Sequence, residues 1–300
     1  MSEKRPRSFY VLAAVFALFV LFLYGPVITI LILSFQGPQG GLTFPMNGFS
    51  VHWFEQLWQG AGLVDISIGL WNSLKLGLLV MVLTVVFSVM AGLAFRRRFR
   101  GSTLLFYTAI ASLIMPSIIV SLGIALEFHI VDDTVMKIAD AYDVEWLYDN
   151  YQTATGLFTS GLGAHLSWTL PFGLLIMFAV FNRFDKSYEE AARDLGATSW
   201  QTIRHVVLPM VAPSVVGVAL FGFTLSWDEL PRSSQAMGAA NTLPIQLQAL
   251  TTTVTTPMIY ALGTVTTAIS LLVIATALTT VFIVQKRRRR HGSDAGQGVV

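Results

Sequence analysis

The sequence contains no cysteine and carries little charge. Without cysteine it can form no disulfide bond, no thiolate metal site and no cysteine nucleophile. Only 12% of the 300 residues are charged, while 54% are hydrophobic, whereas soluble domains carry about a quarter charged residues. The net charge of +2 gives no support for a nucleic-acid partner. The composition therefore indicates a chain whose main solvent is a lipid bilayer.

Six hydrophobic stretches are candidates for crossing a bilayer, which takes about 20 apolar residues in a helix. Because lipid offers no hydrogen-bonding partners, each stretch is expected to be helical. Pro26, Pro116 and Pro171 fall inside three of them and are expected to kink the helices. The predicted fold class is an all-α membrane protein with six transmembrane helices at residues 9–34, 70–95, 103–125, 162–181, 211–226 (the shortest) and 259–284.

The basic residues lie at alternate ends of these stretches. They precede the first and follow the second, fourth and sixth; the exceptions are Lys75, Lys137 and Arg232. Lysine and arginine mark cytoplasmic loops, so both termini and residues 182–210 are predicted to be cytoplasmic. The acidic residues 127–160 are then an outer loop, and the aromatic segment 35–69 is an outer loop with a short interfacial helix.

The chain accordingly divides into three predicted parts. Residues 1–69 supply a peripheral transmembrane helix and the first outer loop. Residues 70–284 form the core transmembrane domain, which includes the cytoplasmic loop 182–210. Residues 285–300 form a basic cytoplasmic tail, whose lysine and arginine run is a topology anchor and a second candidate contact for anionic lipid.

The cytoplasmic loop 182–210 carries two helix-start signals. Ser187 stands three residues before Glu190, and Thr198 stands three residues before Gln201, which is the spacing of a capping box. Gly196 lies between them and suits a left-handed helix end. The pattern predicts two short helices, the second ending at Pro209, that project from the membrane. Such a hairpin either seats in a groove of another protein or lies on the lipid headgroups.

The spacing of small residues in this loop resembles the EAA loop of binding-protein-dependent type I ABC importer permeases. The resemblance rests on Glu190-Ala191-Ala192, Gly196 and Leu208-Pro209, with Val206 in place of the family's usual isoleucine. It implies a coupling helix that docks on a separate ATP-binding subunit. Glu190 would then pair with or cap a group on that subunit, Ala191 and Ala192 would permit close approach, and Gly196 would make the turn.

The same resemblance implies the remaining partners. They are two ATP-binding subunits, a second permease subunit that is homologous or identical, an extracytoplasmic solute-binding protein and membrane lipid. No cofactor is expected in this chain, since ATP and magnesium would bind the partner ATPase. The chain has no glycine-rich loop ending in Gly-Lys-Ser or Gly-Lys-Thr, so it is not expected to be an enzyme. The expected location is the plasma membrane of a prokaryote, which is the inner membrane in a Gram-negative cell.

The predicted outer end of the fifth stretch carries the candidate substrate residues Trp227, Asp228 and Glu229. Adjacent acids at a membrane boundary are costly unless they are solvated or paired, so they form either a cation site or an ordinary helix end in water. The run Phe223 to Glu229 resembles a Phe-Thr-x-Ser-x-Asp-Asp/Glu pattern of polyamine-type permeases. That likeness implies uptake of a polyamine or a similar cation by alternating access.

Other functions stay open. Another small solute could be imported by the same mechanism, or the chain could be a secondary transporter driven by an ion gradient. The latter predicts inverted repeats and ionisable residues at mid-span, which the sequence lacks. A membrane-embedded enzyme or a scaffold is a third alternative. No catalytic residue and no metal ligand is predicted. The five histidines show no metal-binding spacing and are expected to be interfacial or structural: His52, His129, His165, His205 and His291.

Overall fold

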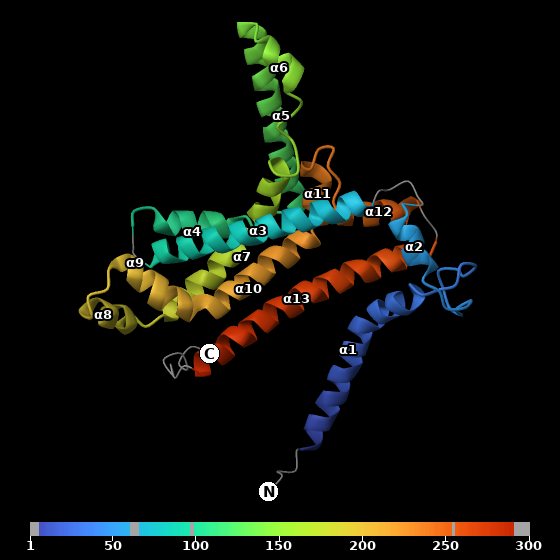
Figure 1. Ribbon diagram of the computed structural model, residues 1–300, viewed down its shortest axis with the longest axis horizontal. Coiled ribbons are helices and arrows are strands. Elements are labelled where there is room, and N and C mark those ends of the chain that lie inside the picture. The colour runs from blue at the N-terminus through green and yellow to red at the C-terminus, as the bar shows by residue number, and fades with distance from the viewer. Residues whose placement is uncertain (1–5, 61–65, 97–98, 254–255, 291–300) are drawn as a thin grey trace. The chain divides into compact units, whose positions relative to one another are not determined.

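A computed structural model describes residues 6–60, 66–96, 99–253 and 256–290. Lys4, Arg5, Arg97, Arg98 and the tail beyond residue 290, including His291, lie outside them. The helices follow one another as α1 (Arg7–Leu33), α2 (His52–Trp58), α3 (Ile66–Phe95), α4 (Ser102–Ala111), α5 (Ser117–Tyr142), α6 (Glu145–Asn150), α7 (Ser160–Arg183), α8 (Ser187–Asp194), α9 (Ser199–Thr202), the π-helix η1 (Ile203–Val207), α10 (Leu208–Trp227), α11 (Leu230–Ala236), α12 (Leu243–Thr253) and α13 (Met258–Arg290) (Figure 1).

The chain forms two compact units, the first made of Met1–Ser67 with Gln246–Leu271. In this unit the Tyr260 hydroxyl donates a hydrogen bond to the Leu42 carbonyl at 2.7 Å. The buried Gln36 side chain organises the loop after α1, since its amide nitrogen donates to the Gly41 carbonyl and its oxygen accepts from the Asn47 N–H. The short helix predicted in segment 35–69 is confirmed as α2.

The second unit comprises Ile68–Ile245 and Leu272–Val300 and contains α3 to α11. Among the described residues, five helices are long and apolar enough to cross a membrane: Arg7–Leu33, Ile66–Phe95, Ser160–Arg183, Ser199–Trp227 and Met258–Thr280. They correspond to all the predicted spans except the third. Pro26 and Pro171 lie within continuous helices, and the kinks expected at them stay a prediction.

The prediction of one helix over residues 103–125 was wrong. The chain forms α4, which at about 1.5 Å per residue is too short to cross a bilayer alone, then a break at residues 112–116, then α5. Pro116 is the residue before α5; proline has no N–H to donate and disfavours helical geometry in the residue that precedes it. The break is also held from outside α4, because the Ser112 hydroxyl donates a hydrogen bond to the Ser167 carbonyl of α7 at 3.2 Å. The six-span count stays a prediction.

The outer segment 127–160 was predicted to be a loop, and most of it is helical. Helix α5 continues past the predicted end of the third span to Tyr142, and α6 follows after Asp143, which adopts a left-handed conformation at φ 50°. Glu127, Met136, Lys137 and Ala139 of this stretch are residues of high helix propensity. In Figure 1, α5 and α6 extend away from α3, α7 and α10 as an arm of the second unit.

Helices α3, α7 and α10 approach one another closely at glycines. A Cβ atom at Gly173 of α7 would lie within 2.1 Å of the Ser88 hydroxyl oxygen on α3, and one at Gly222 of α10 would lie 3.2 Å from the Met81 Cα. Small residues permit such contacts, and in lipid this packing replaces the hydrophobic effect as the force between helices. Thr84 and Thr169 add a buried hydroxyl hydrogen bond of 2.8 Å between α3 and α7.

Replacing Gly173 with leucine should therefore separate α3 from α7. Overpacking of this kind costs about 1–3 kcal/mol, and we expect a lower midpoint of thermal unfolding in detergent. A Cβ atom at Gly163 on the same helix would meet no neighbouring atom within 4 Å, so Gly163→Leu is the matched control. Equal unfolding midpoints for the two variants would contradict the close-packing account.

Candidate functional site

The segment 182–210 begins with helix α8, whose C-terminal end follows the expectation. Gly196 has φ of 85°. Its N–H donates to the Arg193 carbonyl at 2.8 Å, and the Ala197 N–H donates to the Ala192 carbonyl at 3.0 Å. This pair of bonds is a Schellman motif, which satisfies the last carbonyls of the helix. Gly196 therefore makes the turn that its position in the sequence predicts.

The two predicted capping boxes have different outcomes. The box at Ser187 is wrong, because α8 has no side-chain cap and its preceding residue, Lys186, is helical. Instead, the Asp185 carboxylate accepts the Ser187 N–H at 2.9 Å. The box at Thr198 is confirmed: the Gln201 N–H donates to the threonine hydroxyl, and the glutamine side chain accepts the Thr198 N–H.

The second short helix does not end at Pro209. Helix α9 continues through the π-helical turn η1 directly into α10, and Pro209 lies in the first turn of α10. Proline has no N–H to continue the α-helical bonding pattern, and the π-helical turn η1 lies at the junction directly before it. The segment after Gly196 is therefore continuous with the apolar helix α10.

Half of the residues predicted to couple to an ATPase are exposed. Glu190, Ala191 and Gly196 are exposed, and Ala192, Leu208 and Pro209 are half-buried. Leu195 and Trp200, which the motif did not include, are 90% and 65% exposed. Large apolar side chains exposed beside a short helix fit a surface that another protein covers. The coupling role of all these residues stays a prediction.

The acid next to Glu190 points the other way. Glu189 is buried, and its carboxylate accepts a hydrogen bond from Arg96, which directly follows α3. Arg193 lies one helical turn further along α8, with its nitrogen 3.4 Å from the second carboxylate oxygen. From the sequence, Arg96 was predicted only to mark a cytoplasmic loop, and no role was predicted for Glu189.

The opposite end of the α3, α7 and α10 bundle holds the predicted substrate residues. Asp228 is exposed. Trp227 is buried, with its ring stacked 5.5 Å from that of Phe223. Glu229 is also buried and caps the N-terminus of α11, where its carboxylate accepts from the Arg232 N–H. The structure therefore separates three neighbouring residues into one that faces solvent and two that pack inside.

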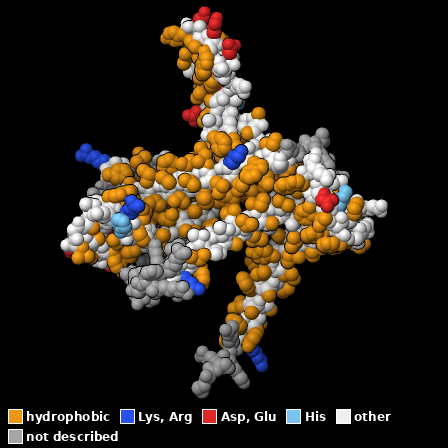
Figure 2. All heavy atoms as spheres, in the orientation of Figure 1, with side chains coloured by type: hydrophobic (Ala, Val, Ile, Leu, Met, Phe, Trp, Pro, Cys, Tyr) orange, Lys and Arg blue, Asp and Glu red, His pale blue; other side chains and the backbone are white. Residues whose placement is uncertain are grey.

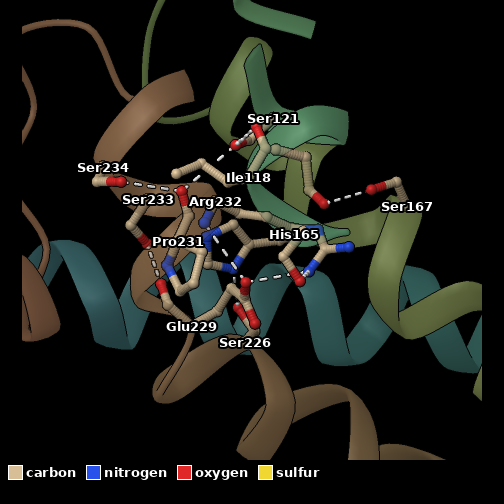
Figure 3. A network of polar contacts seen from close by, with 12 residues as sticks. Ile118, Ser121, His165, Ser167, Ser226, Glu229, Pro231, Arg232, Ser233 and Ser234 are labelled. Carbon is tan, nitrogen blue, oxygen red and sulfur yellow. Dashed lines mark hydrogen bonds and ion pairs between the residues drawn. The ribbon is translucent and has the colours of Figure 1, made fainter. Parts of the chain in front are cut away.

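Arg232 is the centre of a buried polar network (Figure 3). Its side chain has no exposed area, and its guanidinium donates to the Glu229 carboxylate at 3.0 Å and to the Ser117 hydroxyl at 2.8 Å. The guanidinium carbon lies 4.7 Å from the centre of the Trp168 ring, within reach of a cation–π interaction. These contacts fasten α11 to α5 and α7.

His165 belongs to the same network, where it lies buried between two serine hydroxyls. One ring nitrogen lies 2.8 Å from the Ser226 hydroxyl of α10 and the other lies 3.1 Å from the Ser233 hydroxyl of α11. The Ser121 hydroxyl adds a bond of 3.3 Å to the Pro231 carbonyl. The short helix α11 is thus held by side chains from α5, α7 and α10 together.

The arm formed by α5 and α6 carries acidic side chains at its far end, visible in Figure 2. Asp132 joins the arm to the segment before α7, since its carboxylate accepts from the Tyr151 hydroxyl at 2.5 Å, the Thr153 hydroxyl at 2.7 Å and the Ala154 N–H at 2.5 Å. Partial burial raises the pKa of Asp132, but these hydrogen bonds outweigh it, and the net pKa is below the ordinary value of 3.8.

An apolar cavity of about 280 Å³ lies among α3, α4 and α7, beside the break before α5. Its lining carries no charged residue; it includes Phe87, Ser88, Ser112, Leu170 and Pro171. The cavity therefore offers no counter-charge to a cation. Within the described part of the chain, no group of three or more His, Asp or Glu side chains could hold a metal ion.

Sequence reasoning missed the two arginines that organise the ends of this bundle. A signal existed for Arg232, since it stands three residues after Glu229, which is a favourable spacing for an ion pair on a helix. No comparable signal existed for Arg96, because Glu189 is 93 residues away.

Comparison with known proteins gives one family. Residues 84–290 match the family described as the binding-protein-dependent transport system inner membrane component. The spermidine/putrescine transport system permease protein PotC of Haemophilus influenzae is 28% identical over 252 residues, covering 83% of this chain and 88% of its own length. The putrescine transport system permease protein PotI of Escherichia coli (strain K12) is 30% identical over 246 residues, covering 81% and 80%.

Solved structures share the fold at low sequence identity. A chain of a bacterial ABC transporter that imports the acidic polysaccharide alginate aligns with a TM-score of 0.64 at 16% identity, covering 91% of this chain and 93% of that one. A chain of the inward-facing MetNI methionine ABC transporter aligns with a TM-score of 0.54 at 16% identity, covering 72% and 94%.

The tether at Asp132 should loosen in acid. Because its folded pKa lies below the ordinary value of 3.8, the stabilisation is complete above about pH 5 and is lost as the pH falls through the folded pKa. We expect hydrogen exchange of residues 151–155, corrected for the intrinsic effect of pH, to accelerate as the pH falls from about 5 through the folded pKa. In Asp132→Asn it should be fast throughout; an acid-dependent step that survives in this variant would exclude Asp132 as the cause.

Proposed function

Because this chain belongs to the family of binding-protein-dependent transport system inner membrane components, we propose that it is the permease subunit through which an ATP-driven importer takes up polyamines. The family is one of transport permeases and not of enzymes. The observation that carries the substrate class is the likeness to spermidine/putrescine and putrescine permeases over more than four fifths of the chain. Import of a different small solute by the same mechanism is the alternative.

The proposed complex brings this chain into contact with several kinds of partner. Two ATP-binding subunits lie on the cytoplasmic side and hold ATP and magnesium; a second permease subunit, homologous or identical, completes the pathway; and a solute-binding protein delivers substrate from outside. Lipid surrounds the apolar helices. The family and the apolar spans support a multi-pass protein of a bacterial inner membrane.

Helix α8 is the proposed coupling helix. Its exposed side offers Glu190 and Ala191, beside the protruding Leu195 and Trp200. An acid, a small side chain and two large apolar groups suit a groove that has a basic rim and an apolar floor. Ala192 and Gly196 keep the helix short and its end sharp, while Leu208 and Pro209 begin the helix that carries the movement into the membrane.

Asp228 is the proposed cation contact of the pathway. It is exposed at the end of α10, whereas the neighbouring Glu229 is already neutralised by Arg232. An exposed carboxylate attracts a passing alkylammonium, while a buried pair does not. Trp227 would support Asp228 by packing beneath it, and Glu229 would hold α11 at the end of the pathway.

Reversing the charge of Glu190 tests the coupling face. In Glu190→Lys we expect co-purification of the ATP-binding subunit, and transport with it, to fall by about tenfold or more, since an interface charge pair becomes repulsive. Asn182→Lys is the control for the new lysine, because it introduces the same side chain at an exposed position of the same segment outside α8. Normal assembly and transport in Glu190→Lys would remove Glu190 from the interface.

Single substitutions separate the roles of the two outer acids. Asp228→Asn should raise the KM for putrescine uptake several-fold, about 1 kcal/mol of lost attraction, without changing the midpoint of thermal unfolding. Glu229→Gln leaves Arg232 as a buried charge without its partner, so the main effect should be a lower unfolding midpoint. Putrescine uptake that is unchanged by Asp228→Asn would exclude Asp228. Uptake of a neutral solute, and none of putrescine or spermidine, by the wild-type complex would overturn the substrate class.

A further inference from the structure

The coupling helix α8 has two connections to the membrane helices. Along the chain, it packs against α9 and η1, which continue into α10. Through space, Glu189 reaches Arg96 at the end of α3, a partner 93 residues earlier in the sequence. The second connection joins α8 to a helix that it does not precede or follow in the chain.

Arg96 is fixed on more than one side. Its guanidinium carbon lies 5.4 Å from the centre of the Phe181 ring and 5.3 Å from that of Phe184, where a cation–π interaction is favourable. Both rings are buried, and they belong to the apolar cluster that includes Val207 at the end of η1 and Val211 near the start of α10. The arginine therefore ties together the end of α3, the end of α7 and the cluster beneath α10.

Burial makes this connection stiff. The side chains of Arg96 and Glu189 are only 14% and 11% exposed. Separating the two would leave two poorly solvated charges, and an uncompensated buried charge is strongly unfavourable. A displacement of α8 is thus transmitted to α3 more readily than it is absorbed by opening the pair.

The adjacent acids on α8 consequently divide two tasks. Successive residues of an α-helix point about 100° apart, so Glu190 can face a partner while Glu189 faces the bundle. We propose that the Arg96–Glu189 pair is a transmission link which makes α3 follow α8 when the ATPase closes. Both are positioning residues, since they act through the helices and touch no substrate. The proposal rests on the proposed function, because it assumes that α8 receives the movement.

The decisive measurement is the number of substrate molecules transported per ATP hydrolysed. The complete complex, with its ATPase and binding protein, is reconstituted in liposomes and supplied with labelled putrescine. Arg96→Gln and Glu189→Gln should still hydrolyse ATP, but the transported amount per ATP should fall by about fivefold or more, the lower range of measured couplings between sites. The exchanged variant Arg96→Glu with Glu189→Arg keeps the net charge and should recover part of that ratio.

Arg100→Gln is the matched control for the loss of positive charge. Arg100 is exposed in the same loop, so it shares the topological role of Arg96 but not its ion pair. The control should keep the wild-type ratio. Wild-type ratios in both Arg96→Gln and Glu189→Gln, or an equal loss in Arg100→Gln, would overturn the proposal.

A paired variant covers the case in which a single substitution leaves a buried charge without its partner and thereby prevents assembly. Arg96→Met with Glu189→Met removes both charges together, a change that buried ion pairs often tolerate. Spin labels at Phe99→Cys and Ser187→Cys report the distance between the segment after α3 and the start of α8. This chain has no native cysteine, so it offers no other labelling site. In the otherwise unchanged protein this distance should stay constant when the ATPase is trapped closed, whereas in the paired variant it should change. A constant distance or a wild-type transport ratio in the paired variant would refute the link.

The wild-type complex distinguishes a failure of the proposed function from a failure of the transmission link alone. If it neither binds an ATPase nor transports, the proposed function fails. If it does both, and the Arg96 and Glu189 variants do so with the same ratio, only the transmission link fails.

Discussion

Close contact between α3 and the helices α7 and α10 is the constraint on which the second unit depends. In lipid there is little hydrophobic gain from bringing apolar helices together, so association rests on tight packing and a few polar bonds. Gly173 and Gly222 provide the space, and the Thr84–Thr169 bond adds a polar contact in the same region. This packing brings residues at each end of the bundle into range of partners that are distant in sequence.

The two ends of the bundle use the same chemical solution. At one end Arg96 pairs with Glu189 beside two phenylalanine rings, and at the other Arg232 pairs with Glu229 beside Trp168. In each case a buried arginine fastens a short helix, α8 or α11, to longer ones. Arginine suits this task because its planar group can donate hydrogen bonds at its edge while its face lies against an aromatic ring. The short helices are thereby attached to the bundle, while Glu190 and Asp228 remain exposed.

The break between α4 and α5 shows where periodicity and composition mislead. Residues 103–125 are mostly apolar and carry no charge, so they satisfy a hydropathy criterion for one helix. Pro26 and Pro171 are accommodated inside helices, yet Pro116 coincides with the end of regular structure. The difference lies in the surroundings: near Pro116, Ser112 contacts α7, and Ser117 and Ser121 bond to α11. Tertiary contacts stabilise the separated ends, and the sequence alone does not reveal them.

Local signals determined much of this protein. The apolar runs specified five of the helices, the turn at Gly196 followed from glycine's access to positive φ, and the Thr198 capping box followed from residues three apart. Such features depend on neighbours within one or two helical turns. The tertiary structure alone decided that Glu189 and not Glu190 is buried, that Glu229 is buried against Arg232 while Asp228 is exposed, and that Arg96 is more than a topology marker. The physical reason is that burial and charge pairing depend on which helices meet, and a one-dimensional pattern of charge and hydrophobicity does not contain that information.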